Sequence, residues 1–210
     1  MLRFENVQKL YGNFLALDIP SFTINNGLVW LKGENGSGKT TLLKMIAGLH
    51  PFKGTILLND NLTIKNQRQQ FLSLVNYAEA EPLYPSFLTT RDLVKLYCHA
   101  KKGDIQHTQR LLQQLHIYDD YKKPLGAYSS GMIKKLSLAL AFTGNPQLIL
   151  LDEPLITIDA DAVNVICAVI QQHVEKGVSF IITSHQAVEQ YQLPFNQVLL
   201  VANRTIININ

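Results

Sequence analysis

The sequence of 210 residues lacks several features that define specialised classes of protein. No apolar run approaches the ~20 residues that cross a bilayer, and residues 1–8 carry charges where a signal peptide would be apolar. Cysteine occurs only at Cys98 and Cys167, without metal-type spacing, and the six histidines form no His-x-x-x-His pattern. We therefore expect a soluble, cytosolic protein with two reduced thiols.

Strong charge and internal repetition are also absent. The formal net charge of +3 is too small to predict nucleic-acid binding, and we find no repeat or low-complexity linker. Apolar residues make up 47% of the chain and charged residues 17%, which is typical of globular proteins. The length suits one domain over residues 1–210, with room for a small inserted subdomain, and we expect no nucleic-acid partner.

The most informative stretch is residues 33–41, Gly-Glu-Asn-Gly-Ser-Gly-Lys-Thr-Thr, which fits the pattern Gly-x-x-x-x-Gly-Lys-[Ser/Thr]. A strand is predicted before it, at residues 28–31, and a helix after it, at residues 41–48. Backbone amides of such a loop, together with a helix N-terminus, bind a di- or triphosphate. Lys39 would reach the β- and γ-phosphates, and the Thr40 hydroxyl would bind Mg²⁺. An ordinary glycine-rich turn is the alternative, which the flanking strand and helix disfavour.

Two acids follow another apolar run. Residues 148–153, Leu-Ile-Leu-Leu-Asp-Glu, predict a buried strand of a parallel sheet, and ligands bind beyond the carboxyl ends of such strands. Asp152 suits the outer coordination sphere of Mg²⁺, and Glu153 suits a base that polarises water. A single acid here would as readily cap the next turn, but the phosphate loop favours the functional reading. A strand at residues 178–182 ends in Thr183-Ser184-His185, which places His185 in the same layer.

Further strands are predicted at residues 2–7, 14–24, 27–31, 54–58 and 71–77. Tyr11 falls in the first break, where its ring would stack on a nucleotide base or lie exposed in a turn. From Pro82 the pattern becomes helical, with helices at residues 92–99 and 105–115. Ser129 or Ser130 is expected to cap a helix at residues 132–143. A helix at residues 159–176 and a hairpin of residues 199–201 and 205–209 complete the chain.

Taken together, the phosphate loop, the Tyr-Ser-Ser-Gly-Met sequence at 128–132, the acidic strand, Asp159 and His185 resemble the ATP-binding subunits of ABC transporters. The sequence at 128–132 is the most specific part, because many phosphate-loop proteins share the rest. The resemblance implies an α/β fold with a P-loop NTPase (RecA-like) core, an N-terminal antiparallel β-subdomain and an inserted helical subdomain at about 82–145. It also implies that two subunits, identical or different, close face to face around two ATP molecules. Such subunits drive a separate integral membrane permease from the inner face of the cell membrane.

The resemblance further assigns roles to single residues. Tyr11 resembles the base-stacking aromatic, Asp152 the Walker B aspartate, Glu153 the catalytic base, Asp159 the acid of the D-loop and His185 the switch histidine. Ser129, Ser130 and Gly131 would contact the γ-phosphate of the nucleotide held by the other subunit. The phosphate and Mg²⁺ cradle would comprise Gly33, Asn35, Gly36, Ser37, Gly38, Lys39, Thr40 and Thr41.

Three departures from the family pattern qualify these roles. The sequence at 128–132 stands for the commoner Leu-Ser-Gly-Gly-Gln, and residues 155–158 are more apolar than usual. When the loop is aligned on Tyr77 and Pro82, Ala80 stands where the family has a glutamine that senses Mg²⁺ and the membrane subunit. Either Glu79 or Glu81 would ligate Mg²⁺ instead, or both acids would lie exposed.

Two alternatives to a transport ATPase stay open: a soluble ABC-type ATPase, and a nucleotide-binding module that regulates without turnover.

Overall fold

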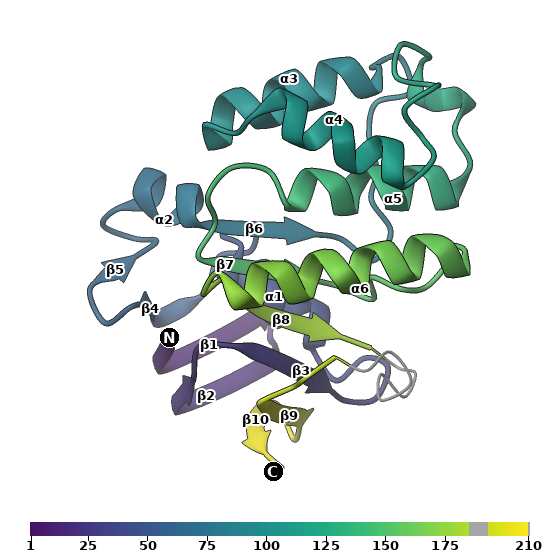
Figure 1. The fold of residues 1–210 in the computed structure, drawn as a ribbon. Helices are drawn as coiled ribbons and strands as arrows, with labels where there is room; N and C mark the ends of the chain where they lie inside the picture. Colours follow the sequence, from purple (N-terminus) through teal and green to yellow (C-terminus); the bar gives the residue numbers. More distant parts are fainter. Residues whose placement is uncertain (185–192, 210) are drawn as a thin grey trace.

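The computed structural model describes residues 1–184 and 193–209, and its strands form two sheets (Figure 1). The first sheet is antiparallel, in the order β2-β1-β4-β5. Its strands are β1 (Leu2–Tyr11), β2 (Phe14–Ile24), β4 (Lys53–Leu58) and β5 (Leu62–Thr63). This sheet is the predicted antiparallel N-terminal layer.

The second sheet has six strands in the order β10-β9-β3-β8-β7-β6. Neighbouring strands from β9 to β6 are parallel, and β10 pairs antiparallel with β9 as the predicted hairpin. The strands are β3 (Leu28–Lys32), β6 (Val75–Ala78), β7 (Leu148–Leu151), β8 (Ser179–Thr183), β9 (Gln197–Ala202) and β10 (Thr205–Asn208). Because parallel strands end at the same edge, the segments that follow β3, β6, β7 and β8 meet there.

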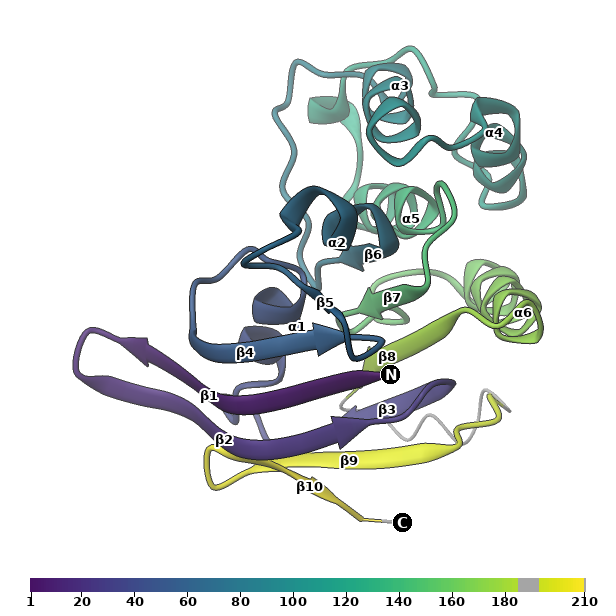
Figure 2. The ribbon, with the colours of Figure 1, turned by 90° about the vertical axis from the view of Figure 1, so that its left-hand side faces the viewer.

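Helices cover both faces of the parallel sheet. α1 (Lys39–Ile46) packs between the two sheets, and α5 (Ser130–Ala141) and α6 (Ala160–Glu175) pack on the opposite face. α3 (Thr90–Lys101) and α4 (Ile105–Gln114) lie beyond α5, farthest from the antiparallel sheet (Figures 1 and 2). α2 (Arg68–Leu74) precedes β6, and a short 3₁₀ helix, η1 (Leu125–Ala127), precedes α5.

Alternation along β7 shows why this strand is apolar throughout. Leu148 and Leu150 belong to the core shared by α1 and the antiparallel sheet, whereas Ile149 and Leu151 belong to the core under α5 and α6. All four side chains are buried. A strand covered on both faces has no polar side, so the prediction of a central strand here is confirmed.

One predicted element is wrong, and several bounds differ. Residues 71–77 were expected to form a strand, but Phe71 lies in α2 and the strand begins at Val75. Gln67 precedes α2 without a side-chain cap, so no capping signal marked the helix, and a short apolar run has no period of its own. β1 extends beyond the predicted residue 7 to Tyr11, and β5 was not predicted.

The predicted helices of the region from Pro82 to residue 145 are present. Thr89 caps α3 in a reciprocal capping box with Asp92, and Asp104 caps α4. Ser129, rather than Ser130, caps α5. That α3 to α5 form a separate helical subdomain stays a prediction.

Candidate active site

The phosphate loop follows β3 and leads directly into α1. Gly36 and Gly38 have φ angles of 79° and 110°, in the left-handed region that favours glycine. A Cβ at Gly33 would approach the Val201 carbonyl oxygen to 2.8 Å, so the chain passes too close to β9 for a larger residue. α1 begins at Lys39, two residues earlier than predicted. Its first amides therefore point into the concave side of the loop.

Lys39 lies inside this loop and is 6% exposed. Its Nζ donates to the carbonyl oxygens of Gly33 at 2.8 Å and Glu34 at 3.0 Å. Burial lowers the pKa of Lys39, while the charges of Glu153 and Asp152 act in the opposite direction. Both acids are thus within electrostatic reach of the loop. The buried Ser37 hydroxyl has no hydrogen-bond partner among the described residues, so the loop holds a cation and an unused polar group together.

The two acids follow β7 at the same edge. Asp152 is 1% exposed, and its carboxylate accepts from Thr183 Oγ1 at 2.6 Å and from the Tyr77 hydroxyl at 3.4 Å. The amide of Glu153 donates to the same Thr183 hydroxyl at 2.9 Å. Glu153 has a φ of 47°, which is uncommon for a residue other than glycine and is found at strained functional positions. Burial and Asp152 raise the pKa of Tyr77, so its hydroxyl stays a donor.

Lys134 lies behind the acids and was not predicted. It is 1% exposed, and its Nζ donates to the carbonyl oxygens of Glu79 at 2.7 Å, Ala80 at 3.0 Å and Asp152 at 2.9 Å. Burial lowers the pKa of Lys134 to about 8, against the raising effect of Asp152 and Glu153. Its sequence signal was weak, because Lys134 and Lys135 stand together in an amphipathic helix and nothing in the pattern separates the buried lysine from its neighbour.

The loop around Ala80 follows β6 at this edge. The Glu79 carboxylate is 3.2 Å from the Lys44 ammonium of α1, and Glu81 is exposed. Glu79 therefore has a cationic partner within the chain. The structure offers no polar side chain at position 80 itself.

Tyr11 ends β1 beside the phosphate-loop helix. Its hydroxyl lies 2.9 Å from His50 Nδ1 and 3.4 Å from Thr41 Oγ1, while its side chain is 45% exposed. The Lys9 ammonium lies 4.5 Å from the ring centroid. An aromatic face next to the loop remains accessible, as a base-stacking role requires.

The Tyr-Ser-Ser-Gly-Met sequence lies at the N-terminus of α5. Ser129 accepts from the Met132 amide at 3.2 Å, and both Ser129 and Ser130 are exposed. A Cβ at Gly131 would approach the Thr157 carbonyl oxygen to 2.8 Å, which explains the glycine. These contacts are local to α5 and the 157 turn, and none of them joins the sequence to the phosphate loop.

Asp159 caps α6 and connects it with α5. Its carboxylate accepts from the Ala162 amide at 2.9 Å and forms an ion pair with Lys135. The hydrogen bond from Lys135 lowers the pKa of Asp159 to about 2. His185, the predicted switch histidine, lies outside the described residues.

The residues present suit a nucleotide with Mg²⁺. Within residues 1–184 and 193–209, no group of three or more His, Cys, Asp or Glu is placed to hold a metal ion alone. Mg²⁺ commonly binds through one or two carboxylates together with substrate phosphates. The exposed Thr40 and the Asp152 carboxylate supply such oxygens beside the phosphate loop, and the unused Ser37 hydroxyl is available to a phosphate.

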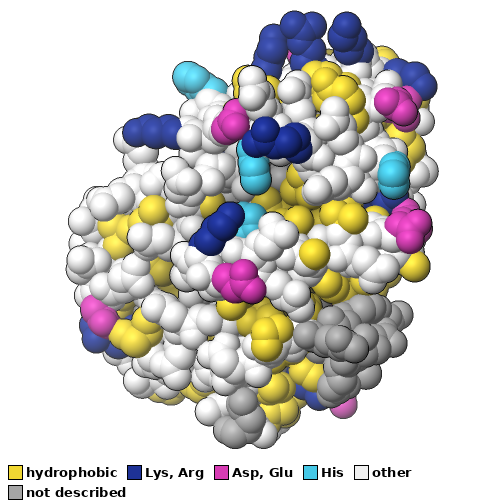
Figure 3. All heavy atoms as spheres, viewed as in Figure 1, with side chains coloured by type: hydrophobic (Ala, Val, Ile, Leu, Met, Phe, Trp, Pro, Cys, Tyr) yellow, Lys and Arg dark blue, Asp and Glu magenta, His cyan; other side chains and the backbone are white. Residues whose placement is uncertain are grey.

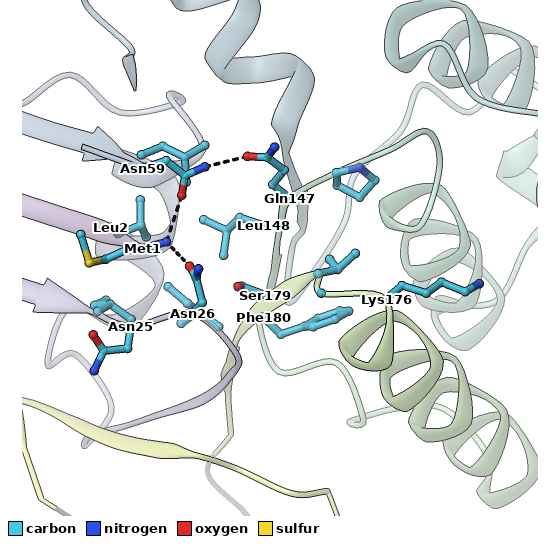
Figure 4. Close-up of a pocket in the computed structure, with 16 residues that line it drawn as sticks. Met1, Leu2, Asn25, Asn26, Asn59, Gln147, Leu148, Lys176, Ser179 and Phe180 are labelled. Carbon is cyan, nitrogen blue, oxygen red and sulfur yellow. Dashed lines mark hydrogen bonds between the residues drawn. The ribbon is translucent and has the colours of Figure 1, made fainter. Parts of the chain in front are cut away.

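A cavity of about 380 Å³ lies at the opposite edge of the sheet, by the amino ends of β3, β7 and β8 (Figure 4). Met1, Asn26, Asn59 and Gln147 line it and form a hydrogen-bonded chain, in which Asn59 Nδ2 donates to Gln147 Oε1 at 2.8 Å. No carboxylate lies among its described lining residues. It therefore lacks the acids that the phosphate-loop edge provides.

Comparisons with known sequences agree with this geometry. A family model described as "ABC transporter" matches residues 17–156. The cytochrome c biogenesis ATP-binding export protein CcmA of Legionella pneumophila (strain Lens) is 36% identical over 174 residues, covering 81% of this chain and 82% of that protein. ATP-binding cassette sub-family A member 2 of Homo sapiens is 30% identical over 215 residues, which cover 97% of this chain and 9% of that protein.

Solved structures share the fold. An ATP-binding subunit of an ABC transporter superposes with a TM-score of 0.88 at 21% identity, covering 100% of this chain and 90% of that one. A dimeric ATP-binding cassette in a post-hydrolysis state, bound to ADP and Pi, gives 0.84 at 17% identity, covering 100% and 99%. The structural likeness and the family model, which spans more than half of the chain, lead to one conclusion: this chain belongs to the ABC transporter family.

Proposed function

We propose that this chain binds and hydrolyses ATP to power transport through a separate membrane permease. The observation that carries the proposal is topological: the loop with Lys39 follows β3, and Asp152 and Glu153 follow β7, at the same edge of the parallel sheet. No helix in the described part of the chain is long and apolar enough to cross a membrane. The relatives named CcmA are described as ATP-binding export proteins, which supports a role in transport.

Each group at the site has a distinct task in this proposal. Lys39 and the amides at the start of α1 hold the β- and γ-phosphates, and Tyr11 packs on the base. Thr40 and Asp152 hold Mg²⁺, which would neutralise charge on the transferred phosphoryl group. Glu153 accepts a proton as water attacks the γ-phosphorus and the bond to the bridging oxygen breaks.

The active form in this proposal is a dimer of ATP-binding subunits. Ser129 and Ser130 are exposed at the N-terminus of α5, where free amides and the helix dipole favour an anion. The cap of Ser129 is local to α5 and does not reach the phosphate loop of the same subunit. In this proposal, the two serines therefore contact the γ-phosphate that the other subunit holds. A solved structure with the same fold is described as dimeric and bound to ADP and Pi, which supports a dimer but not these particular contacts.

The permease contact is proposed at the groove between α2 and the helices α3 and α5. This groove encloses about 1150 Å³ and is lined by Leu72, Glu79, Pro82, Tyr84 and Tyr97 among others. Leu83, at its edge, is 93% exposed, which is unusual for a large apolar side chain. Docking here would hold the chain at the inner face of the membrane. On the face in Figure 3, basic side chains lie along the top edge, and acidic and histidine side chains are spread below them.

A regulatory module without turnover is the second candidate, because Ala80 has no polar group and Glu79 is paired with Lys44. Phosphate release by the purified chain, with Glu153→Gln as the matched inactive variant, separates the two. Turnover that is present and lost in Glu153→Gln supports the ATPase, and binding without turnover supports the module. Co-purification from membranes with a multi-span protein separates a transport ATPase from a soluble ABC-type ATPase.

A further inference from the structure

We infer that Lys134 is a positioning residue that holds the loop after β6 against the acidic end of β7. An ammonium has three donors, and Lys134 directs them to three main-chain carbonyls, those of Glu79, Ala80 and Asp152. Because its partners are carbonyls rather than carboxylates, it holds the path of the backbone and leaves the acid side chains available. A lysine that is 1% exposed needs such compensation for its lost hydration.

The loop that Lys134 holds is also tied to the phosphate-loop helix. The Glu79 carboxylate pairs with Lys44 of α1 at 3.2 Å, while the Glu79 carbonyl accepts from Lys134 of α5 at 2.7 Å. Glu79 thus joins α1, which starts at the phosphate loop, to α5, which Ser129 caps. Since Ala80 has no polar side chain, its link to the acidic strand is made by its carbonyl, through Lys134.

Lys134 contacts the main chain of Asp152, whereas Thr183 contacts its side chain. The Asp152 carbonyl accepts from Lys134 at 2.9 Å, and its carboxylate accepts from Thr183 at 2.6 Å. Glu79 and Pro82 line the groove between α2, α3 and α5, so a partner that moves this loop would shift Asp152 through one side chain. This inference rests on the proposed function, because it specifies how occupancy of that groove changes the hydrolysis site.

The test compares Lys134→Met, which keeps length but removes the donors, with Lys134→Arg, which keeps a cation with several donors. The control is Lys101→Met, because Lys101 is a partly buried lysine that donates to two carbonyls, those of Leu72 and Val75, and neither belongs to the 79–80 loop or the acidic strand end. Steady-state ATP hydrolysis gives kcat and KM, and hydrogen exchange reports on amides 79–81 and 152–153.

We expect Lys134→Met to lower kcat about 10- to 100-fold with KM for ATP nearly unchanged, as misplaced catalytic groups do. Exchange should rise at amides 79–81 and 152–153, and Lys134→Arg should restore most of kcat. Lys101→Met should lower the melting temperature without this loss of kcat. If Lys134→Met does not fold, Lys134→Gln replaces it, with a smaller loss of the same kind.

Three results would overturn the inference. They are a normal kcat in the donor-free variant, a loss of kcat equal to that of Lys101→Met, or unchanged exchange at amides 79–81. If the unmodified chain hydrolyses no ATP, the proposed function fails instead. Hydrogen exchange then still decides whether Lys134 holds the loop.

Discussion

The Thr183 hydroxyl donates to the Asp152 carboxylate at 2.6 Å and accepts from the Glu153 amide at 2.9 Å. A side chain from the end of β8 therefore holds both acids that follow β7. Thr183 is fully buried, so its hydroxyl has no water to replace either partner. The chemistry of the site thus depends on a residue that carries no charge.

We expect Thr183→Val, which keeps the shape and removes the hydroxyl, to delete the hydrogen bonds to the Asp152 carboxylate and from the Glu153 amide. The free energy of unfolding should fall by about 1–3 kcal/mol. Hydrolysis should slow by at least tenfold, because Asp152 loses its orientation. Denaturant unfolding and phosphate release measure the two effects. Thr183→Ser keeps the hydroxyl and should stay close to the unmodified protein, and equal defects in both variants would contradict the role of the hydroxyl.

Lys39→Ala should abolish tight ATP binding. Removing a buried cation that pairs with phosphate costs ~3–5 kcal/mol, which is more than a hundredfold in affinity. Titration calorimetry with ATP gives the dissociation constant. Lys65→Ala removes an exposed lysine outside the phosphate loop and should leave the affinity unchanged. Undiminished affinity in Lys39→Ala would refute the assignment of the loop.

Glu153→Gln should stop hydrolysis and let ATP trap a dimer. Glutamine keeps the size of the side chain and its hydrogen bonding but cannot accept the proton from water. Gel filtration with Mg-ATP and with Mg-ADP shows whether the dimer depends on the γ-phosphate. Glu175→Gln, at the far end of α6, is the control and should turn over normally. Normal turnover by Glu153→Gln would remove Glu153 from the role of base.

His173 should make the fold sensitive to mild acid. Its Nδ1 lies 2.8 Å from the Val169 carbonyl oxygen, and its ring packs against Phe142 and Phe180. Burial lowers the pKa of His173, so the unfolded chain binds a proton below about pH 6.5 more readily than the folded chain does. The free energy of unfolding should therefore fall as pH decreases through this range.

Denaturant titrations at about pH 7.5 and about pH 5.5, on either side of the ordinary histidine pKa, check this expectation. His173→Gln should be less stable at the higher pH but lose less stability on acidification. His116→Gln is the control, because His116 is exposed just after α4 and lies outside the core that holds His173. An equal loss on acidification with and without His173 would place the acid sensitivity elsewhere.

Ala80→Gln should speed basal hydrolysis by about tenfold to a hundredfold. One oriented polar contact to the charge that develops in the transition state contributes on that scale. Lys134 already holds the backbone of this loop at Ala80, so a glutamine side chain at position 80 would extend from a fixed main-chain position. Phosphate release at several Mg²⁺ concentrations tests this. Glu79→Ala should not mimic the gain, and no gain in Ala80→Gln would mean that the alignment of this loop is wrong.

Much of the fold followed from local signals. β2 has the predicted bounds of Phe14–Ile24 because its apolar and polar residues fill a sheet with one exposed face, and α6 begins one residue after its predicted start, Asp159, which caps it. The prediction of a strand failed at Phe71 because this buried residue belongs to a short helix that has no side-chain cap. A buried helix turn and a buried strand have the same composition over so few residues.

The candidate site was predictable where motif residues act through their own side chains, as with Lys39, Asp152 and Glu153. Thr183 and Lys134 were not singled out because their partners lie 31 and 54 or 55 residues away in sequence. Such contacts arise from the order of strands β6, β7 and β8, which no local pattern encodes. Lys134 in particular binds main-chain carbonyls, which every residue type has, so the sequence does not mark its partners.

The left-handed backbone of Glu153 sets stability against activity at a single position. A non-glycine residue with this backbone costs about 1–2 kcal/mol relative to an ordinary conformation, a cost that glycine would not have. In a library selected only for heat resistance, the backbone term thus favours glycine here. Each such variant would lose the proposed base. Stabilised versions of this protein therefore need position 153 held constant, with improvements sought away from the ends of β7 and β8.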